Sequence, residues 1–268
     1  MDAIVLAGGI PTPQDPLYPY TQGRPKALLD IAGKPMTQWV VEALEGSAHI
    51  RRILIVGLKP TGALHGHKIA GYLPDQGGII PNILAGLREV LRRDPQAEYT
   101  VVASGDIPAI TAVMVDWVIE HAADGTPFDI AYSAIRREVM EARFPEARRT
   151  FTRLKDLEVC GGDLQVVRTA LVNTHTAIWE RLIAARKNPF KQAAIIGWDV
   201  LLKLALRRLA LEEALTVISR RLGVRGKLLL PPYAELGMDA DKPHQVDLLR
   251  RELANGNRPL VPPQEPPQ

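Results

Sequence analysis

Three short runs of apolar, mostly β-branched residues stand out in the N-terminal part of the chain. They are Ala3–Leu6, Ile53–Val56 and Tyr99–Val102. A strand buried on both faces of a parallel sheet reads as a continuous apolar run, without the alternation of a half-exposed strand. The three runs therefore predict three buried, parallel strands.

Between these runs, apolar residues recur at helical spacing. The pattern predicts helices over 36–44, 82–91 and 113–121, and the residues 129–132 are expected to form a further strand. Strands that alternate with helices are typical of βαβ units. We therefore predict an α/β fold with three layers and a mostly parallel, Rossmann-like sheet.

From about Phe144 the pattern of alternating strands and helices changes. Short strands are expected at 150–154 and 163–167 with a turn at 160–162, then helices at about 176–186, 189–206 and 211–222. A strand at 227–230 and a helix at 243–253 are expected to follow. Residues 1–254 would thus form one domain with a largely helical insertion at about 140–225. The Pro-rich segment 255–268 is expected to be disordered.

The composition excludes several classes of protein. The 33 basic and 30 acidic residues give a formal net charge of only +3, so we expect neither nucleic acid nor an anionic membrane as a partner. Cys160 is the single cysteine, which excludes an internal disulfide and a multi-cysteine metal site. No apolar run is long enough for a signal peptide or a membrane span, and we expect a cytoplasmic protein.

Candidate chemistry begins where the first predicted strand ends, at Leu6-Ala7-Gly8-Gly9. Paired glycines let backbone N–H groups approach a ligand closely, at the edge where open α/β sheets bind ligands. The sequence contains neither a G-x-G-x-x-G fingerprint nor a P-loop. Taken alone, the glycines are a weak signal and favour a simple tight turn after a strand.

Two cations, Arg24 and Lys26, follow this turn. A lysine close to a glycine turn can contact phosphates as a point charge, and an arginine can donate two hydrogen bonds to them. The alternative is that both are solvated cations of a surface loop.

A carboxylate, Asp106, follows the third predicted strand and would point into the same crevice as the glycines. Mg²⁺ prefers one or two carboxylates together with phosphate oxygens, so Asp106 is a candidate ligand. It could instead cap the next helix, although Thr111 is better placed for that role. Asp239 and Asp241, just before the last helix, are candidates for a second carboxylate.

The order of these motifs resembles that of nucleotidyltransferases with a GT-A-like fold. The motifs are LAGG after a strand, RPKALLDIAGKPM, SGDIP after a third strand, and GMDADKP before the last helix. The resemblance is to the molybdenum-cofactor-guanylyltransferase-like NTP transferases, with sugar-phosphate nucleotidyltransferases as cousins. It extends from Met1 to about Leu253 and is weakest between 144 and 231. It implies Mg²⁺-dependent transfer of a nucleotidyl group from an NTP to a phosphorylated sugar, polyol or cofactor, with release of pyrophosphate.

The resemblance also implies roles for individual residues. The backbone of Leu6, Ala7, Gly8 and Gly9 would hold the nucleotide, together with Gly78 and Asn82 near the base. Lys26, helped by Arg24, would bind the phosphates. Asp106 and Asp241 would hold Mg²⁺, with Asp239 as the alternative to Asp241. Gly161, Gly162 and Asp163 would lie near the acceptor.

One departure from the family pattern concerns the loop after the double glycine. Family members usually place an arginine there, whereas Ile10–Pro16 contains no basic residue and three prolines that stiffen it. Either Arg24 supplies the missing charge, or catalysis is weak or lost. The alternatives are therefore a weakly active or inactive nucleotide- or sugar-binding protein and, less favoured, a GT-A glycosyltransferase, which would usually show Asp-x-Asp near mid-chain.

The segment 198–222 carries more apolar residues than one face of a surface helix needs. We expect it to cover the acceptor pocket or to form a two-fold contact in a homodimer. The alternative is that it packs within its own domain.

Overall fold

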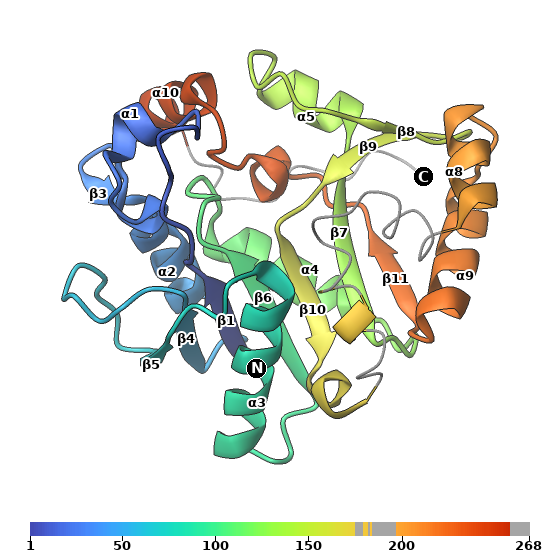
Figure 1. Cartoon of the computed structure of the whole chain (residues 1–268), viewed down its shortest axis with the longest axis horizontal. Helices are drawn as coiled ribbons and strands as arrows, with labels where there is room; N and C mark the ends of the chain where they lie inside the picture. Colours follow the sequence, from blue (N-terminus) through green and yellow to red (C-terminus); the bar gives the residue numbers. More distant parts are fainter. Residues whose placement is uncertain (175–178, 182, 184–196, 258–268) are drawn as a thin grey trace.

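The computed structural model describes residues 1–174, 179–181, 183 and 197–257. Its centre is a sheet whose first half is parallel, with the order β5-β4-β1-β6 (Figure 1). These strands are β1 (Asp2–Leu6), β4 (Arg52–Val56), β5 (Ile69–Leu73) and β6 (Tyr99–Ser104). The three predicted buried strands are confirmed, and β1 lies between the other two, with Ala3 paired to Ile53 and to Val101.

The second half of the sheet is mixed. It contains β7 (Ile130–Arg136), β8 (Thr152–Arg153), β9 (Glu158–Gly161), β10 (Leu164–Arg168) and β11 (Gly226–Leu229). β10 lies antiparallel between β6 and β7, while β11 pairs with β7 in parallel. The turn expected at 160–162 is wrong in its position, because Cys160 pairs with Ile135 and belongs to β9. The chain turns instead around Gly162 and Asp163, whose N–H groups donate to the carbonyls of Ser133 and Leu236.

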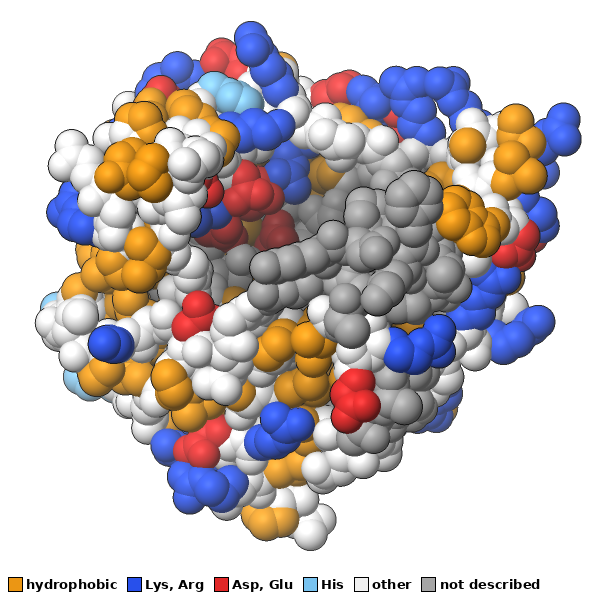
Figure 2. All heavy atoms as spheres, viewed as in Figure 1, with side chains coloured by type: hydrophobic (Ala, Val, Ile, Leu, Met, Phe, Trp, Pro, Cys, Tyr) orange, Lys and Arg blue, Asp and Glu red, His pale blue; other side chains and the backbone are white. Residues whose placement is uncertain are grey.

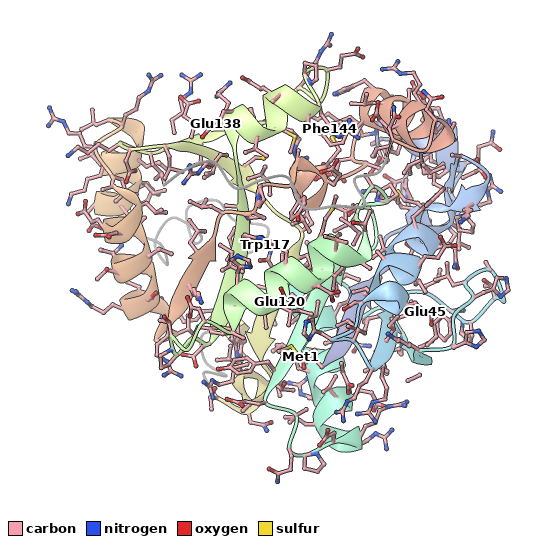
Figure 3. All side chains as sticks on the ribbon, turned by 180° about the vertical axis from the view of Figure 1, so that it is seen from behind. Met1, Glu45, Trp117, Glu120, Glu138 and Phe144 are labelled. Carbon is pink, nitrogen blue, oxygen red and sulfur yellow. The ribbon has the colours of Figure 1, made fainter. Side chains whose placement is uncertain are left out.

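Helices cover both faces of the sheet, which confirms the predicted three layers. α2 (Met36–Gly46) and α4 (Ala112–Ala122) cover one face, the one with Trp117 and Glu120 (Figure 3). α3 (Ile79–Arg93) and the short helix η2 (Thr169–Asn173) cover the other. Alternate residues of β1 serve the two cores: Ala3 and Val5 face α2 and α4, whereas Ile4 faces α3. A Cβ on Gly86 would lie 2.7 Å from the Ile4 side chain, so this glycine lets α3 pack tightly on β1.

Further described elements flank the sheet and its helices. They are α1 (Tyr18–Thr21), η1 (Lys26–Leu28), β2 (Asp30–Ile31), β3 (Lys34–Pro35), α5 (Arg137–Arg143), η3 (Ala234–Gly237) and α10 (Pro243–Ala254). Within the part of the chain that the structure describes, no helix is both long and apolar enough to cross a membrane.

The stretch 140–225, where we expected a largely helical insertion, also contains the strands β8, β9 and β10. β10 belongs to the central sheet, and two helices, α8 (Trp198–Ala205) and α9 (Leu211–Leu222), come after it. The helix expected at 176–186 and the first part of the one expected at 189–206 lie largely outside the described residues, as does most of the segment 255–268. Val200 of α8 and Ala214 of α9 share a small apolar cluster, while Leu202 and Leu206 are 61% and 55% exposed.

Candidate active site

The carboxyl ends of β1 and β6 open into a cavity of about 810 Å³. In Figure 2 acidic side chains gather in a hollow on this face of the molecule. The structure brings most of the predicted site residues together here. Those that line the cavity are Leu6, Ala7, Gly8, Gly9, Lys26, Gly78, Asn82, Asp106, Gly162, Asp163, Asp239 and Asp241.

The double glycine makes the turn that the sequence suggested. Gly9 has a φ of 103°, a left-handed conformation that glycine adopts without strain. A Cβ on Gly57, at the end of β4, would lie 2.4 Å from the Cα of Gly8, so the two loops touch through their backbones. The N–H of Lys26 donates to the carbonyl of Gly9 at 3.1 Å, which closes the intervening loop and places Lys26 beside the glycine turn.

Lys26 contacts both of the predicted metal ligands, Asp106 and Asp241. Its Nζ donates to Asp106 Oδ2 at 2.6 Å and to Asp241 Oδ1 at 2.5 Å. The Oγ of Ser104 donates to the other oxygen of Asp106 at 2.5 Å. Because one ammonium group contacts both carboxylates, Asp106 and Asp241 lie close enough to share a single cation, although they come from distant parts of the sequence.

The electrostatics of this group follow from its geometry. Burial by itself would lower the pKa of Lys26, but the charges of Asp106 and Asp241 outweigh burial and raise it. Burial would likewise raise the pKa of Asp106, but the Lys26 ammonium and the Ser104 hydrogen bond hold it below its ordinary value. Lys26 is therefore a fixed positive charge and Asp106 a fixed negative charge at neutral pH.

The backbone around Asp106 is held by its neighbours in the sheet. The N–H of Gly105 donates to the carbonyl of Leu6 at 2.9 Å, and Thr37 Oγ1 donates to the carbonyl of Gly105 at 2.9 Å. A Cβ on Gly105 would lie 2.8 Å from that Leu6 oxygen. Glycine is therefore needed at this position for β1 and β6 to approach each other directly in front of the carboxylate.

Asp241 is positioned by the start of α10. The Oε1 of Gln245, a residue that is 2% exposed, accepts from the N–H of Asp241 at 3.1 Å and from the N–H of Lys242 at 2.9 Å. The N–H of Ala240 donates to the carbonyl of Asp106 at 3.0 Å. This helix cap and the Ala240 hydrogen bond tie the two carboxylate segments to each other.

Asp239 and Asp163 form a second acidic group next to the first. Asp239 forms an ion pair with Arg149 rather than with Lys26. Burial raises the pKa of Asp239 to about 6, and burial together with the charges of Asp106 and Asp239 raises the pKa of Asp163 to about 8. The Oδ2 of Asp163 is buried and, among the described residues, has no hydrogen-bond partner. The sequence indicated Asp163, whereas nothing in it linked Arg149 to this site.

The segment expected to contact the base, from Gln76 to Asn82, lies beside the glycine turn and away from Asp163 and Asp239. Asn82 Oδ1 accepts from the N–H of Gln76 at 2.7 Å, and its Nδ2 donates to Asp75 Oδ1 at 2.9 Å. Asp75 also lines the cavity and accepts from the N–H of Gly77 at 2.9 Å. Asn82 therefore shapes the loop ahead of α3. Asp75 is a site residue that sequence reasoning missed, although it directly precedes the segment from Gln76 to Gly78.

Two predicted residues are not brought into the cavity. Arg24 is exposed, and its Nε donates to the carbonyl of Thr21 at 3.3 Å. Gly161 lies in β9, where a Cβ would be 2.8 Å from the hydroxyl of Tyr132, and it is absent from the described cavity lining. Lys26 is thus the one Lys or Arg among the described residues that line the cavity.

A glycine turn, a lysine and paired carboxylates at the carboxyl edge of a mostly parallel sheet define a nucleotidyltransferase-type site. The chain belongs to the MobA-like NTP transferase family, whose domain model matches residues 3–223. The family and the class of enzyme that the sequence predicted are thereby confirmed.

Individual relatives agree with this assignment. A solved structure described as a hypothetical transferase from Thermus thermophilus is 36% identical, with a TM-score of 0.79, and the match covers 91% of this chain and 98% of that one. A molybdenum cofactor guanylyltransferase from Rhizobium meliloti is 27% identical over 146 residues, 54% of this chain and 63% of that protein. A bifunctional protein GlmU from Methanococcus vannielii is 42% identical over 60 residues, which are 22% of this chain and only 13% of that protein.

Proposed function

We propose that this protein transfers a nucleotidyl group from an NTP to a phosphorylated small molecule, such as a sugar, polyol or cofactor phosphate, with the help of Mg²⁺. The observation that carries the proposal is the contact of one ammonium group, Lys26, with both Asp106 and Asp241 beside the Gly8-Gly9 turn. Family membership supports the nucleotidyl transfer, and the site geometry supports a bound cation.

The proposed reaction needs little covalent help from the protein. An oxygen of the acceptor phosphate attacks the α-phosphorus of the NTP, the bond between the α-phosphorus and its bridging oxygen to the β-phosphorus breaks, and pyrophosphate leaves. The attacking phosphate is already ionised near neutral pH, so no general base is required. The protein contributes positioning and neutralisation of charge.

The residues present fit a magnesium ion. Although the described residues contain no group of three or more His, Cys, Asp or Glu side chains that could hold a metal, Mg²⁺ is usually bound by one or two carboxylates together with phosphate oxygens. Asp106 and Asp241 would hold it, since both already face one cation. The ion would neutralise charge on the reacting phosphates.

The protein's own residues divide the remaining work. Lys26 would contact the phosphates, because its ammonium is the one described cation that lines the cavity. The backbone of Gly8 and Gly9 would approach the nucleotide. Asn82 and Asp75 would hold the loop against which the base lies.

The proposal is tested by measuring pyrophosphate release. The purified full chain is incubated with Mg²⁺, each of the four NTPs, and a panel of sugar, polyol and cofactor phosphates. We expect release that requires one NTP and one class of acceptor together. Release that does not depend on any acceptor would indicate simple hydrolysis and would contradict the proposal.

A second candidate, a nucleotide-binding protein with weak or no activity, is favoured by one observation. The loop Ile10–Pro16 carries no cation, and the Arg24 guanidinium is exposed and turned to Thr21 rather than to the cavity. This candidate predicts NTP binding, measured by calorimetry, without turnover for any acceptor.

We also propose that α8 contributes to a homodimer, because its residue Leu202 and the neighbouring Leu206 are more than half exposed. Light scattering on the wild type and on a Leu202→Glu, Leu206→Glu variant tests this. A wild type that is monomeric at micromolar concentration would exclude the contact.

A further inference from the structure

The cavity continues well beyond the charged group. One end is lined by Gly8, Lys26, Asp106 and Asp241, whereas most of the described residues that line the other end are apolar. We call the apolar side chains at this end the apolar wall. They are Ile83 and Leu87 of α3, Ile130 of β7, Val167 of β10, Leu171 of η2, and Trp179. The charged site and this apolar wall therefore open into the same space.

The two ends of the cavity have different occupants under the proposed function. The glycine turn and the Asp75–Asn82 loop lie on the β1 and β4 side of Asp106, where the nucleotide would bind. The acceptor phosphate would then lie near Lys26. The rest of the acceptor would extend away from β4, over β10 and β7.

The side chains of β10 show what the acceptor would meet there. Like Asp163, the side chains of Gln165 and Val167 face the cavity. The alternate residues Leu164 and Val166 belong to the core on the opposite face of the sheet. Alternate residues of β10 thus contribute to the wall below the carboxyl edge of the sheet.

Two polar side chains of this wall, Gln165 and Trp179, are already engaged within the protein. Gln165 Oε1 accepts from the N–H of Ser133 at 2.7 Å, and its Nε2 donates to the carbonyl of Gly162 at 2.6 Å. Trp179 Nε1 donates to the carbonyl of Leu171 at 3.1 Å. A sugar hydroxyl placed against this wall would lose its hydrogen bonds to water without gaining replacements from these groups. Hydrocarbon placed there would be removed from water at no such cost.

On the basis of the proposed function, we propose that the phosphorylated acceptor carries an apolar group, and that this group lies against Ile130, Val167, Leu171 and Trp179. The substrate class is thus a phosphate monoester with a hydrocarbon chain or ring, rather than a molecule that is hydroxylated throughout. The charged end of the cavity would recognise its phosphate, and the apolar wall would select its body.

A series of acceptors with the same phosphate tests the proposal. The full chain is assayed for pyrophosphate release with Mg²⁺ and the NTP that gives the fastest release. The acceptors are ethyl, butyl and hexyl phosphate, with glucose 1-phosphate and glycerol 3-phosphate as polar references. We expect kcat/KM to rise roughly two- to fourfold for each added methylene until the wall is covered, and to exceed the values of both polar references.

Two substitutions of the same kind test whether the wall is responsible. Val167→Thr adds a hydroxyl to the wall with little change of shape, and we expect it to flatten the dependence on chain length. Val172→Thr is the matched control: Val172 is 2% exposed and belongs to the same apolar cluster as Val167, but it is absent from the described cavity lining. We expect Val172→Thr to keep the wild-type dependence on chain length. That dependence is a ratio between acceptors, so a smaller folded fraction does not change it.

The outcomes separate this proposal from the proposed function. Release that is fastest with glucose 1-phosphate and independent of alkyl length would overturn the apolar acceptor and leave nucleotidyl transfer standing. No release with any pair of NTP and acceptor would contradict nucleotidyl transfer itself. In that case calorimetry with ethyl and hexyl phosphate still decides the present proposal, which is wrong if hexyl phosphate binds no more tightly than ethyl phosphate.

Discussion

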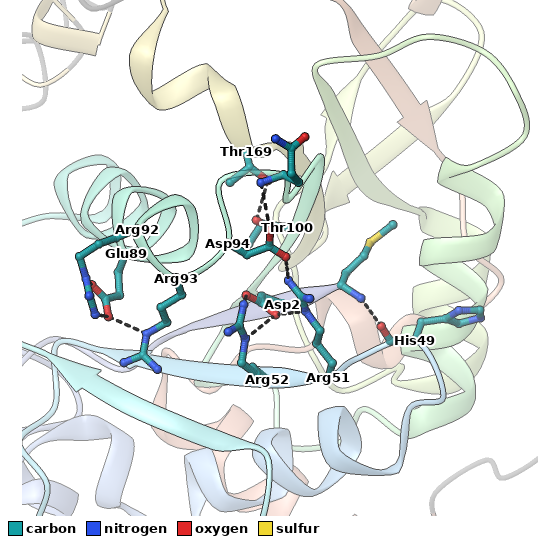
Figure 4. Close-up of polar contacts among 12 residues, drawn as sticks. Asp2, His49, Arg51, Arg52, Glu89, Arg92, Arg93, Asp94, Thr100 and Thr169 are labelled. Carbon is teal, nitrogen blue, oxygen red and sulfur yellow. Dashed lines mark hydrogen bonds and ion pairs between the residues drawn. The ribbon is translucent and has the colours of Figure 1, made fainter.

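The two ends of the central sheet both carry buried acidic side chains, but they balance the charge of these acids differently. At the amino end Asp2 is 1% exposed, and it accepts hydrogen bonds from Arg51 at 2.8 Å and from Arg52 at 2.7 Å (Figure 4). Arg51 also pairs with Asp94. The acids at this end are therefore fully supplied with cations from the chain itself.

At the carboxyl end, acids are in excess among the residues that the structure describes. Four carboxylates, those of Asp106, Asp163, Asp239 and Asp241, share Lys26 and Arg149. Burial and the neighbouring negative charges oppose ionisation here, and both raise the pKa values of Asp163 and Asp239. The comparison teaches that one network is complete within the fold, whereas the other is suited to a further cation from solution.

The largest effect is expected from removing one charge at the acidic end. Asp106→Asn keeps the shape of the side chain but removes half of the proposed metal site, and we expect kcat to fall by about a thousandfold. Steady-state pyrophosphate release measures it. Asp94→Asn, which changes an acid at the opposite end, is the control and should leave kcat unchanged. An equal loss in both variants would indicate a general effect on folding.

Lys26→Ala is expected to lower kcat by about a hundredfold, because it removes the cation that faces the reacting phosphates. It also leaves Asp106 and Asp241 without their shared ammonium. The melting temperature without metal should therefore fall, and Mg²⁺ should restore part of it. If turnover per folded molecule stayed at the wild-type value, Lys26 would be purely structural.

Asp2→Asn should affect stability and leave the chemistry alone. The substitution leaves Arg51 and Arg52 without their buried anionic acceptor, and we expect the free energy of unfolding to fall by about 2 kcal/mol. Urea denaturation measures this loss. Turnover per folded molecule should remain that of the wild type. A loss of turnover without a loss of stability would contradict the purely structural role of the amino end.

A further expected effect is a pH dependence of stability in the metal-free protein. The pKa of Asp163 is raised from 3.8 to about 8, so the folded protein holds this proton more tightly than the unfolded chain. The free energy of unfolding should thus decrease as the pH rises from about 4 to about 8. Urea midpoints in EDTA at about pH 5 and pH 8 measure the decrease. Asp163→Asn should make this decrease smaller. If the variant showed the same decrease as the wild type, the pKa of Asp163 would not be raised.

The strands were predictable to the degree that they are buried on both faces. β1, β4 and β6 are continuous apolar runs, and the sequence located all three. β5 was missed because it is a half-buried edge strand with Gly71 in its middle, so it shows neither an apolar run nor a clean alternation. The boundary between β9 and β10 was misplaced because the paired glycines Gly161 and Gly162 are typical of a turn, and only the pairing with β7 shows that Cys160 and Gly161 belong to β9.

The candidate site was predictable where it follows strand ends and family motifs. Gly8, Lys26, Asp106 and Asp241 belong to such motifs, and the structure places them together. Arg149 could not be found in this way, because its contact with Asp239 spans 90 residues and no local motif marks it. Arg24 shows the opposite case: it is close in sequence to Lys26, but its side chain turns away from the cavity.

The central claim is that the acidic end of the sheet accepts a cation together with a nucleotide. The most direct test is the melting temperature of the wild type and of the Asp106→Asn, Asp241→Asn double variant, measured with Mg²⁺ alone, NTP alone and both together. A ligand that binds only the folded state stabilises it. We predict that the melting temperature of the wild type rises most when Mg²⁺ and NTP are both present. The melting temperature of the double variant should rise no more with both ligands than with NTP alone. An equal gain from Mg²⁺ and NTP in the two proteins would contradict the account.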